Sequence, residues 1–383
     1  MSILIIIVPL LTALIFFLIV PGVGALIVQS NWRKFRINML NATNYPYLEY
    51  SDIKNENNGV NFRFFGSLEA IEDKNKIWLK GDNLSIAADL ENVYVYMLPS
   101  LMTDEEAQRV PWKRISSLVA GTQILISGPL TVENNRSIFK NSSSNALLIV
   151  IFDGEKETLL KRAISGGRKR NEYWNQFTLI SLITGSFSLF SLSYFFFRSP
   201  LLEIPALISL CLSFYPIAIL MPPGVIFFFL YQYFWKIARH LRIDRDLFRI
   251  PLFHFRNNDE TSKKKEALLS NGEKYVMLNV NNLEVSNHLE ENTSVETRQC
   301  STVKREAENN MFIFGSYSPE ADLIVSPKDR MMEFVMIPGD PEKISKKCQK
   351  KSIIFTSLSG MFIVLDISIN LIIILILLSN YIR

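Results

Sequence analysis

The sequence predicts a multi-pass α-helical membrane protein that carries a soluble β-rich domain between its first two membrane spans. Two observations support this fold class. Hydrophobic residues make up 48% of the 383 residues although 20% are charged, so the apolar residues must be concentrated in blocks. Between the first two blocks, short strand-like segments alternate with turn signals, which is the pattern of a small barrel or sandwich.

Four apolar runs are long enough to be membrane spans. They cover residues 3–28, 177–197, 201–235 and 353–382. A hydrocarbon core about 30 Å thick needs about 20 helical residues. The first run has no basic residues before it and is longer than the apolar core of a cleaved signal peptide, so we expect a retained anchor.

The third run is ambiguous because a helix of about 35 residues would be about 52 Å long. Pro216 and the triplet Pro222-Pro223-Gly224 interrupt it. One kinked span with a re-entrant or interfacial arm gives four crossings in all. Two short spans that meet at Pro222-Pro223 give five. We favour four crossings.

Lysine and arginine gather beside the apolar runs, although the net charge is only +4. The four clusters are Arg33, Lys34 and Arg36; Arg168, Lys169 and Arg170; Lys236, Arg239, Arg242 and Arg245; and Lys346, Lys347, Lys350 and Lys351. Short basic flanks stay on the cytoplasmic face, and four crossings place every cluster there. We therefore expect a plasma-membrane or inner-membrane protein whose basic juxtamembrane clusters contact anionic lipid headgroups of the bilayer.

The expected organisation follows from these runs. It comprises an N-terminal transmembrane anchor (1–29), a soluble β-rich domain (30–175), membrane segments (176–236), a polar loop (237–351) and a C-terminal transmembrane helix (352–383).

The soluble domain is predicted from segments rich in β-branched and aromatic residues. They lie at 61–71, 76–80, 92–98, 123–130 and 146–152. The stretch 121–128 is typical of a strand in an OB-like barrel, although many other folds contain such strands. Acidic and basic residues are interleaved here without an aromatic-basic stripe, so we do not expect nucleic acid as a partner.

The polar loop divides into two parts. Residues 257–310 are rich in Asn, Glu, Lys, Ser and Thr, and such a composition predicts that this part is largely disordered. Short strands separated by Ser-Pro and Pro-Gly-Asp-Pro turns are expected at 311–337. These strands could join the first soluble domain if both loops lie on the same face of the membrane.

No catalytic, cofactor-binding or metal site is predicted. The histidines are His240, His254 and His288, and they stand in no zinc-binding or metalloprotease spacing. The chain has no G-x-S-x-G motif and no glycine-rich phosphate loop. The three cysteines are too scattered in the sequence to imply a disulfide framework.

The last apolar run carries the candidate intramembrane polar site. Asp366 lies near its midpoint, and an ionisable group at bilayer depth must be compensated. Polar residues repeat around it at steps of three and four, which places them on one helix face. The candidate residues are Asp366, Asn370, Ser359 and Thr356.

The second apolar run carries a candidate helix-packing face made of small residues, which allow helices to approach closely in lipid. Its members are Thr178, Ser181, Gly185 and Ser188. We expect this face to meet the polar stripe of the last helix.

These features favour a non-enzymatic scaffold or assembly factor, with a membrane protein or a second copy of the chain as its partner. The alternative is a subunit of a transport or ion-handling system that uses Asp366.

Overall fold

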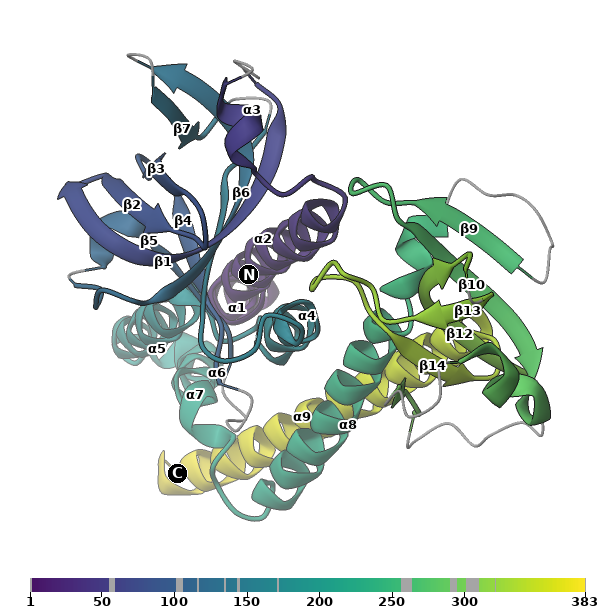
Figure 1. Cartoon of the computed structure of the whole chain (residues 1–383). Helices are drawn as coiled ribbons and strands as arrows, with labels where there is room; N and C mark the ends of the chain where they lie inside the picture. Colours follow the sequence, from purple (N-terminus) through teal and green to yellow (C-terminus); the bar gives the residue numbers. More distant parts are fainter. Residues whose placement is uncertain are drawn as a thin grey trace. The chain divides into compact units, whose positions relative to one another are not determined.

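The computed structural model describes residues 2–54, 59–100, 106–115, 117–133, 136–142, 145–170, 172–255, 264–289, 295–300, 310–320 and 322–382. The chain divides into two compact units (Figure 1). The helical unit comprises Met1–Arg33, Asn171–Arg242 and Gln349–Arg383, and the strand unit comprises Lys34–Arg170 and Ile243–Cys348. Each unit is therefore assembled from segments that are far apart in the sequence.

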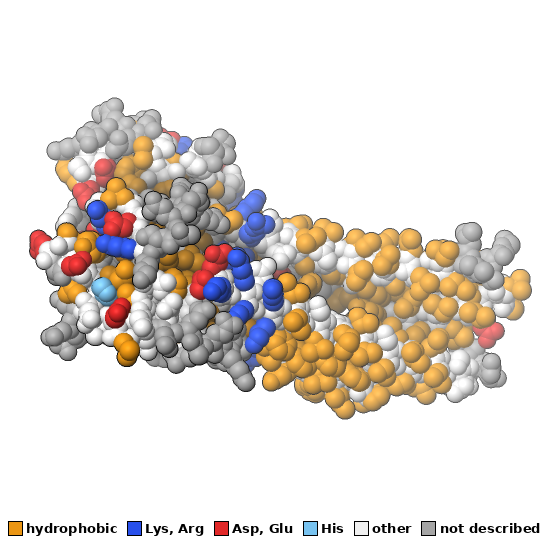
Figure 2. Space-filling model, turned by 90° about the vertical axis from the view of Figure 1, so that its right-hand side faces the viewer, with side chains coloured by type: hydrophobic (Ala, Val, Ile, Leu, Met, Phe, Trp, Pro, Cys, Tyr) orange, Lys and Arg blue, Asp and Glu red, His pale blue; other side chains and the backbone are white. Residues whose placement is uncertain are grey.

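In the part of the chain that is described, three helices are long and apolar enough to cross a membrane: Ile5–Thr43, Gln176–Phe196 and Pro341–Asn380. The first contains α1 (Ser2–Ala13), a π-helical segment (Leu14–Ile19) and α2 (Val20–Thr43); the others are α5 (Gln176–Phe196) and α9 (Pro341–Ile382). Hydrophobic side chains cover the visible face of the helical unit (Figure 2). Such a surface is compatible with lipid and would be costly in water.

The third apolar run is divided between shorter helices. It forms α6 (Glu203–Ser213), α7 (Tyr215–Ala218) and the first half of α8 (Val225–Leu247). Pro216 lies in the first turn of α7, and Pro222-Pro223 falls in the irregular segment before α8. Because proline lacks a backbone N–H and clashes with the preceding turn, the expected interruption is found at these residues.

The first sheet of the strand unit has eight strands, in the order β1-β2-β3-β7-β6-β8-β4-β5. They are β1 (Asn61–Asp73), β2 (Lys76–Lys80), β3 (Ser85–Asp89), β4 (Tyr94–Met97), β5 (Gln108–Pro111), β6 (Gln123–Glu133), β7 (Arg136–Lys140) and β8 (Leu148–Phe152). Because β1 also pairs with β6, the strands β1, β2, β3, β7 and β6 close into a ring. Its interior is filled by apolar side chains such as Phe64, Leu79 and Ile126. The helices α3 (Tyr50–Lys54) and α4 (Leu159–Lys169) flank the sheet in sequence.

The second sheet has six strands, in the order β11-β14-β12-β10-β9 with β13 beside β12. They are β9 (Lys264–Leu268), β10 (Lys274–Asn281), β11 (Glu296–Thr297), β12 (Asn310–Ser318), β13 (Leu323–Val325) and β14 (Val335–Pro338). The short strands expected at 311–337 are thus present as β12, β13 and β14.

The expected disorder of 257–310 is wrong for the part that forms β9 and β10. Composition misled here because Tyr275 and Met277 bury their side chains in one hydrophobic cluster and Val280 in another. Tyr275 and Met277 lie on one face of β10 and Val280 on the other, so apolar residues on both faces hold the strand in the sheet. Residues 256–263, 290–294 and 301–309 of this loop lie outside the described residues.

A buried ion pair joins the two sheets. Arg63 on β1 is fully buried and contacts Asp329, which lies between β13 and β14 and is 3% exposed. The Tyr47 hydroxyl donates a hydrogen bond to Asp329 Oδ1 at 3.1 Å, and the Arg63 guanidinium lies 4.1 Å from the centre of the Tyr47 ring. Burial raises the pKa of Tyr47, so the phenol keeps its proton as the donor to Asp329.

Candidate functional site

The predicted polar stripe of α9 faces the interior of the helical unit. Ser352, Ser359, Asp366 and Asn370 are each no more than 4% exposed, and Thr356 is half-buried. The Thr356 hydroxyl donates to the Ser352 carbonyl at 2.7 Å, and the Ser359 hydroxyl donates to the Thr356 carbonyl at 2.8 Å. These two hydroxyls are satisfied within α9, so Ser352 and Asn370 are the residues of the stripe that hydrogen-bond to other elements.

Asn370 forms hydrogen bonds with the irregular backbone between α7 and α8. Its Nδ2 donates to the carbonyls of Ala218 at 2.6 Å and Met221 at 3.0 Å, and its Oδ1 accepts the backbone N–H of Gly224 at 3.2 Å. Backbone polar groups that are freed by a helix break and buried away from water need other hydrogen-bond partners. One carboxamide supplies three of them for the segment between α7 and α8.

Asp366 is fully buried beside this break. Its Oδ1 accepts a hydrogen bond from Asn370 Nδ2 at 3.0 Å, whereas its Oδ2 has no hydrogen-bond partner among the described residues. Gly224 allows this close approach, because a Cβ at that position would lie 2.2 Å from both Asp366 Oδ1 and Asn370 Nδ2. The backbone before α8 therefore packs directly on the two polar side chains.

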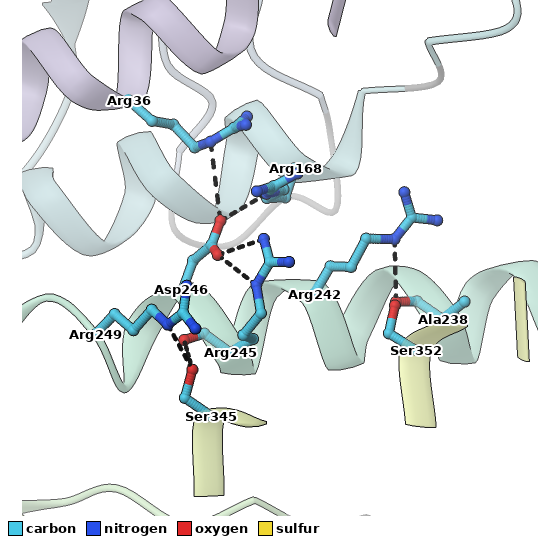
Figure 3. Close-up of polar contacts among 9 residues, drawn as sticks. All are labelled: Arg36, Arg168, Ala238, Arg242, Arg245, Asp246, Arg249, Ser345 and Ser352. Carbon is cyan, nitrogen blue, oxygen red and sulfur yellow. Dashed lines mark hydrogen bonds and ion pairs between the residues drawn. The ribbon is translucent and has the colours of Figure 1, made fainter. Parts of the chain in front are cut away.

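Aromatic rings extend the contact between α8 and α9. Phe227 and Phe234 of α8 stack on Phe362 of α9, with ring centres 6.2 and 5.5 Å apart. At the other end of this interface the Ser352 hydroxyl donates to the Ala238 carbonyl at 3.2 Å (Figure 3). The polar stripe of α9 is thus occupied by α8 and by the segment that precedes it.

The small-residue face of α5 has a different partner from the one expected. Thr178, Ser181 and Gly185 are buried, and Ser188 is half-buried. Ser181 donates to the Phe16 carbonyl, and a Cβ at Gly185 would lie 2.6 Å from Phe16 Cβ. This face packs on the N-terminal helix, so the expected meeting with α9 is wrong. The reason is that α8 already covers the stripe of α9.

A second polar group, the arginine cluster, lies in the strand unit around Asp246. Its arginines are Arg36 from α2, Arg168 from α4 and Arg245 from α8, and they converge on the Asp246 carboxylate (Figure 3). The nearest nitrogens of Arg168 and Arg245 lie 2.6 Å from its oxygens, and that of Arg36 lies 3.8 Å away. Burial alone would raise the pKa of Asp246, but Arg168 and Arg245 outweigh it and hold the pKa below its usual value.

The arginine cluster combines members of three basic clusters that the sequence shows separately. Three guanidinium groups against one carboxylate leave a charge of +2, and these side chains are 8% to 17% exposed. Sequence reasoning missed Asp246 because its role depends on three helices that lie far apart along the chain. The sequence clue to this site is that an acidic residue directly follows Arg245 in a basic segment.

The described residues contain no group of three or more His, Cys, Asp or Glu side chains that could hold a metal ion. Comparison of the chain with protein families, curated proteins and solved structures finds no match. Function therefore has to be inferred from the residues themselves.

Proposed function

We propose that the chain is a multi-pass membrane protein with four crossings, and that its two long loops fold together on one face as a non-enzymatic scaffold. The observation that carries this proposal is the composition of the strand unit, which takes residues from before α5 and after α8. A single folded unit built from both loops requires the intervening chain to cross the membrane an even number of times. With four crossings in all, the chain between the two loops crosses twice, which meets the requirement. With five in all, it crosses three times, which does not.

The helical segment 171–242 can satisfy this requirement with one outward and one returning path. In this proposal α5 is the outward span, and the kinked third apolar run returns. The returning path begins with α6 as the re-entrant arm, passes the irregular segment at Pro222-Pro223 and continues through the first half of α8. The bonds from Asn370 to Ala218, Met221 and Gly224 support this reading, because they satisfy the backbone where the path turns.

The ring of strands is the proposed interaction platform. Antiparallel β1, β2 and β3 are followed by β7, which pairs in parallel with β3, while β6 pairs with both β7 and β1. We interpret this order as an OB-like barrel. A membrane protein or a second copy of the chain is the proposed partner, because the domain lacks the aromatic-basic stripe that nucleic acid requires.

The bilayer itself is the second proposed partner. In the helical unit, Lys and Arg gather at one end of the apolar helices (Figure 2). In the sequence, the basic residues of the helical unit that flank its apolar runs include Arg33, Lys236, Arg239, Arg242, Lys350 and Lys351. Basic side chains at the cytoplasmic surface are attracted to anionic headgroups by about 1 kcal/mol each, so they would fix the depth of the helices.

A transport or ion-handling role is the alternative, and the unpartnered Asp366 Oδ2 is the observation that favours it. A buried carboxyl oxygen without a donor could take a proton or a cation as its partner. The scaffold proposal instead uses Asp366 to hold Asn370 in position. Removal of the Asp366 charge should abolish an ion-handling function but should leave a scaffold function largely intact.

Paired variants of Asp366 test the proposed function. Asp366→Asn keeps a side chain of the same size with hydrogen-bonding capacity, so a scaffold should retain its folded yield and its co-purifying partners. Asp366→Leu should weaken helix packing by about 0.6 to 1.7 kcal/mol. Both variants are compared with wild type for yield in mild detergent, for co-purification and for complementation of a gene deletion. A well-folded Asp366→Asn protein that keeps its partners but fails to complement would favour the ion-handling role.

A further inference from the structure

Two cysteines that are distant in the sequence meet in the strand unit. Cys300 follows β11, and Cys348 lies in the second turn of α9. Their sulfur atoms are 3.6 Å apart as thiols. A disulfide bond needs the sulfurs at about 2.05 Å, so a shift of about 1.5 Å, within the range of side-chain rotation, would join them.

The backbone that carries Cys300 is fixed by its neighbour Arg298. The Arg298 N–H donates to the Met336 carbonyl at 2.8 Å, and its guanidinium makes two bonds to Glu333, at 3.0 and 2.8 Å. The same side chain donates to the Leu247 carbonyl at the end of α8, at 2.7 Å. A bidentate arginine–carboxylate pair of this kind fixes the orientation of the two side chains and also adds electrostatic attraction. It holds the Cys300 segment against α8.

A carboxylate lies beside this pair on α8. The Cys300 thiol donates to Asp244 Oδ2 at 3.2 Å. Burial raises the pKa of Asp244 to about 7, the negative charge of a Cys300 thiolate would add to the shift, and Arg298 opposes it. Asp244 therefore gains and loses its proton near neutral pH, which suits a general base.

The two thiols differ in access. Cys300 is half-buried, whereas Cys348 is fully buried. An external reagent would therefore reach Cys300 first, and Cys348 would react afterwards from inside the fold. The third cysteine, Cys211, belongs to the helical unit, where its thiol donates to the Leu371 carbonyl.

We propose that Cys300 and Cys348 are a reversible disulfide-forming pair, with Asp244 as the base that takes the proton from the Cys300 thiol. The oxidant is a small-molecule disulfide of the glutathione class. This is a modification site of the strand unit and does not depend on the proposed scaffold function.

The reaction balances in two exchange steps. Asp244 accepts the Cys300 proton, the Cys300 thiolate attacks one sulfur of the external disulfide, and the other half leaves as a thiolate that takes up a proton. Cys348 then attacks Cys300 Sγ as its thiolate, and the proton it loses goes to the second half, which leaves as a thiol. The external disulfide is reduced by two electrons to two thiols, and the two cysteines are oxidised to one disulfide.

The bond would tie the segment after β11 to the start of α9. In a reducing compartment such bonds are transient and redox-sensing. The expected resting state has both thiols reduced, and oxidation would restrict the second sheet relative to α9.

The test uses the full-length protein in detergent, equilibrated with oxidised glutathione and then denatured and alkylated with a polyethylene-glycol maleimide. We expect one maleimide per chain at Cys211 instead of three, and a tryptic peptide pair that contains the Cys300–Cys348 bond. Treatment with a reductant should restore three. Cys300→Ser and Cys348→Ser serve as matched controls, and neither should form an intramolecular bond.

The role of Asp244 is tested by the pH dependence of disulfide formation. In wild type the rate should rise around pH 7, and in Asp244→Asn it should rise only as the thiol ionises near its ordinary pKa of about 8.5. At pH 7 we expect the rate of disulfide formation in the variant to be lower than in wild type by up to about tenfold. Wild-type circular dichroism and equal final oxidation would show that the variant is folded.

Three results would overturn this proposal. One is retention of three maleimides after oxidation of the folded wild-type protein. Another is a glutathione adduct on Cys300 that Cys348 never displaces. The third, which would remove Asp244 from the reaction, is an identical pH profile for wild type and Asp244→Asn.

Discussion

Asp329 in the strand unit and Asp366 in the helical unit are both buried carboxylates, but their partners differ. Asp329 is 3% exposed and is compensated by the Arg63 guanidinium and the Tyr47 hydroxyl. Asp366 is fully buried, and its partner among the described residues is the neutral Asn370 carboxamide. In the first case an ion pair links two sheets. In the second case the carboxamide of Asn370 forms hydrogen bonds with the irregular backbone between α7 and α8.

Burial alone therefore does not reveal what a carboxylate does. Removing one member of a buried ion pair leaves the other charge uncompensated, which costs several kcal/mol. Removing one member of a neutral hydrogen bond costs less, about 1 to 3 kcal/mol. The two units should therefore respond to substitution on different scales.

The largest effect is expected for Arg63→Met. Loss of the guanidinium leaves Asp329 buried without its cation, so the free energy of unfolding of the strand unit should fall by about 3 to 5 kcal/mol. Urea titration followed by tryptophan fluorescence measures this change. The control is the double variant Arg63→Met/Asp329→Leu, which should recover most of the loss. A double variant as unstable as the single one would show that the pair does not act through charge.

A pH effect of intermediate size is expected at His254, in the 3-10 turn Pro251–Phe255. Burial lowers its pKa to about 4, with a further lowering by Arg63 that is opposed by Asp329. Above pH 6.5 the histidine is neutral in the folded and unfolded states. Between pH 6.5 and 4 the unfolded state takes up a proton that the folded state does not, so stability falls by about 3 kcal/mol as the pH drops.

His254→Phe isolates this contribution because phenylalanine does not titrate. The free energy of unfolding of the variant should depend less on pH between 6.5 and 4, although other groups will still contribute. Urea titrations at several pH values compare the two proteins. Curves that remain parallel over this interval would contradict the assignment to His254.

The smallest effect is expected for Gly224→Ala in the helical unit. The substitution places a methyl group against Asp366 and Asn370, and overpacking of this kind costs about 1 to 3 kcal/mol. Gly360→Ala is the matched control, because a Cβ there meets nothing within 4 Å and alanine favours the helix. Thermal unfolding in detergent should separate the two. Equal melting temperatures would argue against close packing of Gly224 on the polar pair.

The sequence predicted the elements whose evidence is local. The burial of Asp366 and Asn370 followed from their spacing on one helix, and the strands of the first sheet followed from β-branched residues. The Arg63–Asp329 pair joins residues 266 positions apart, and no local pattern connects them. The same holds for Asp246, whose arginines come from three helices. For β9 and β10, average composition concealed the few apolar residues that hold the strands.

Both long loops are proposed to lie on the same face of the membrane, and cysteine accessibility tests this placement. Single cysteines replace Ser85 of the first loop, Ser270 of the second and Ser199 between α5 and α6, in a chain whose own cysteines are removed. With an impermeant thiol reagent on intact cells, we expect labelling at position 199 and protection at 85 and 270 until the cells are permeabilised. Labelling that differs between positions 85 and 270 in intact cells would contradict the claim.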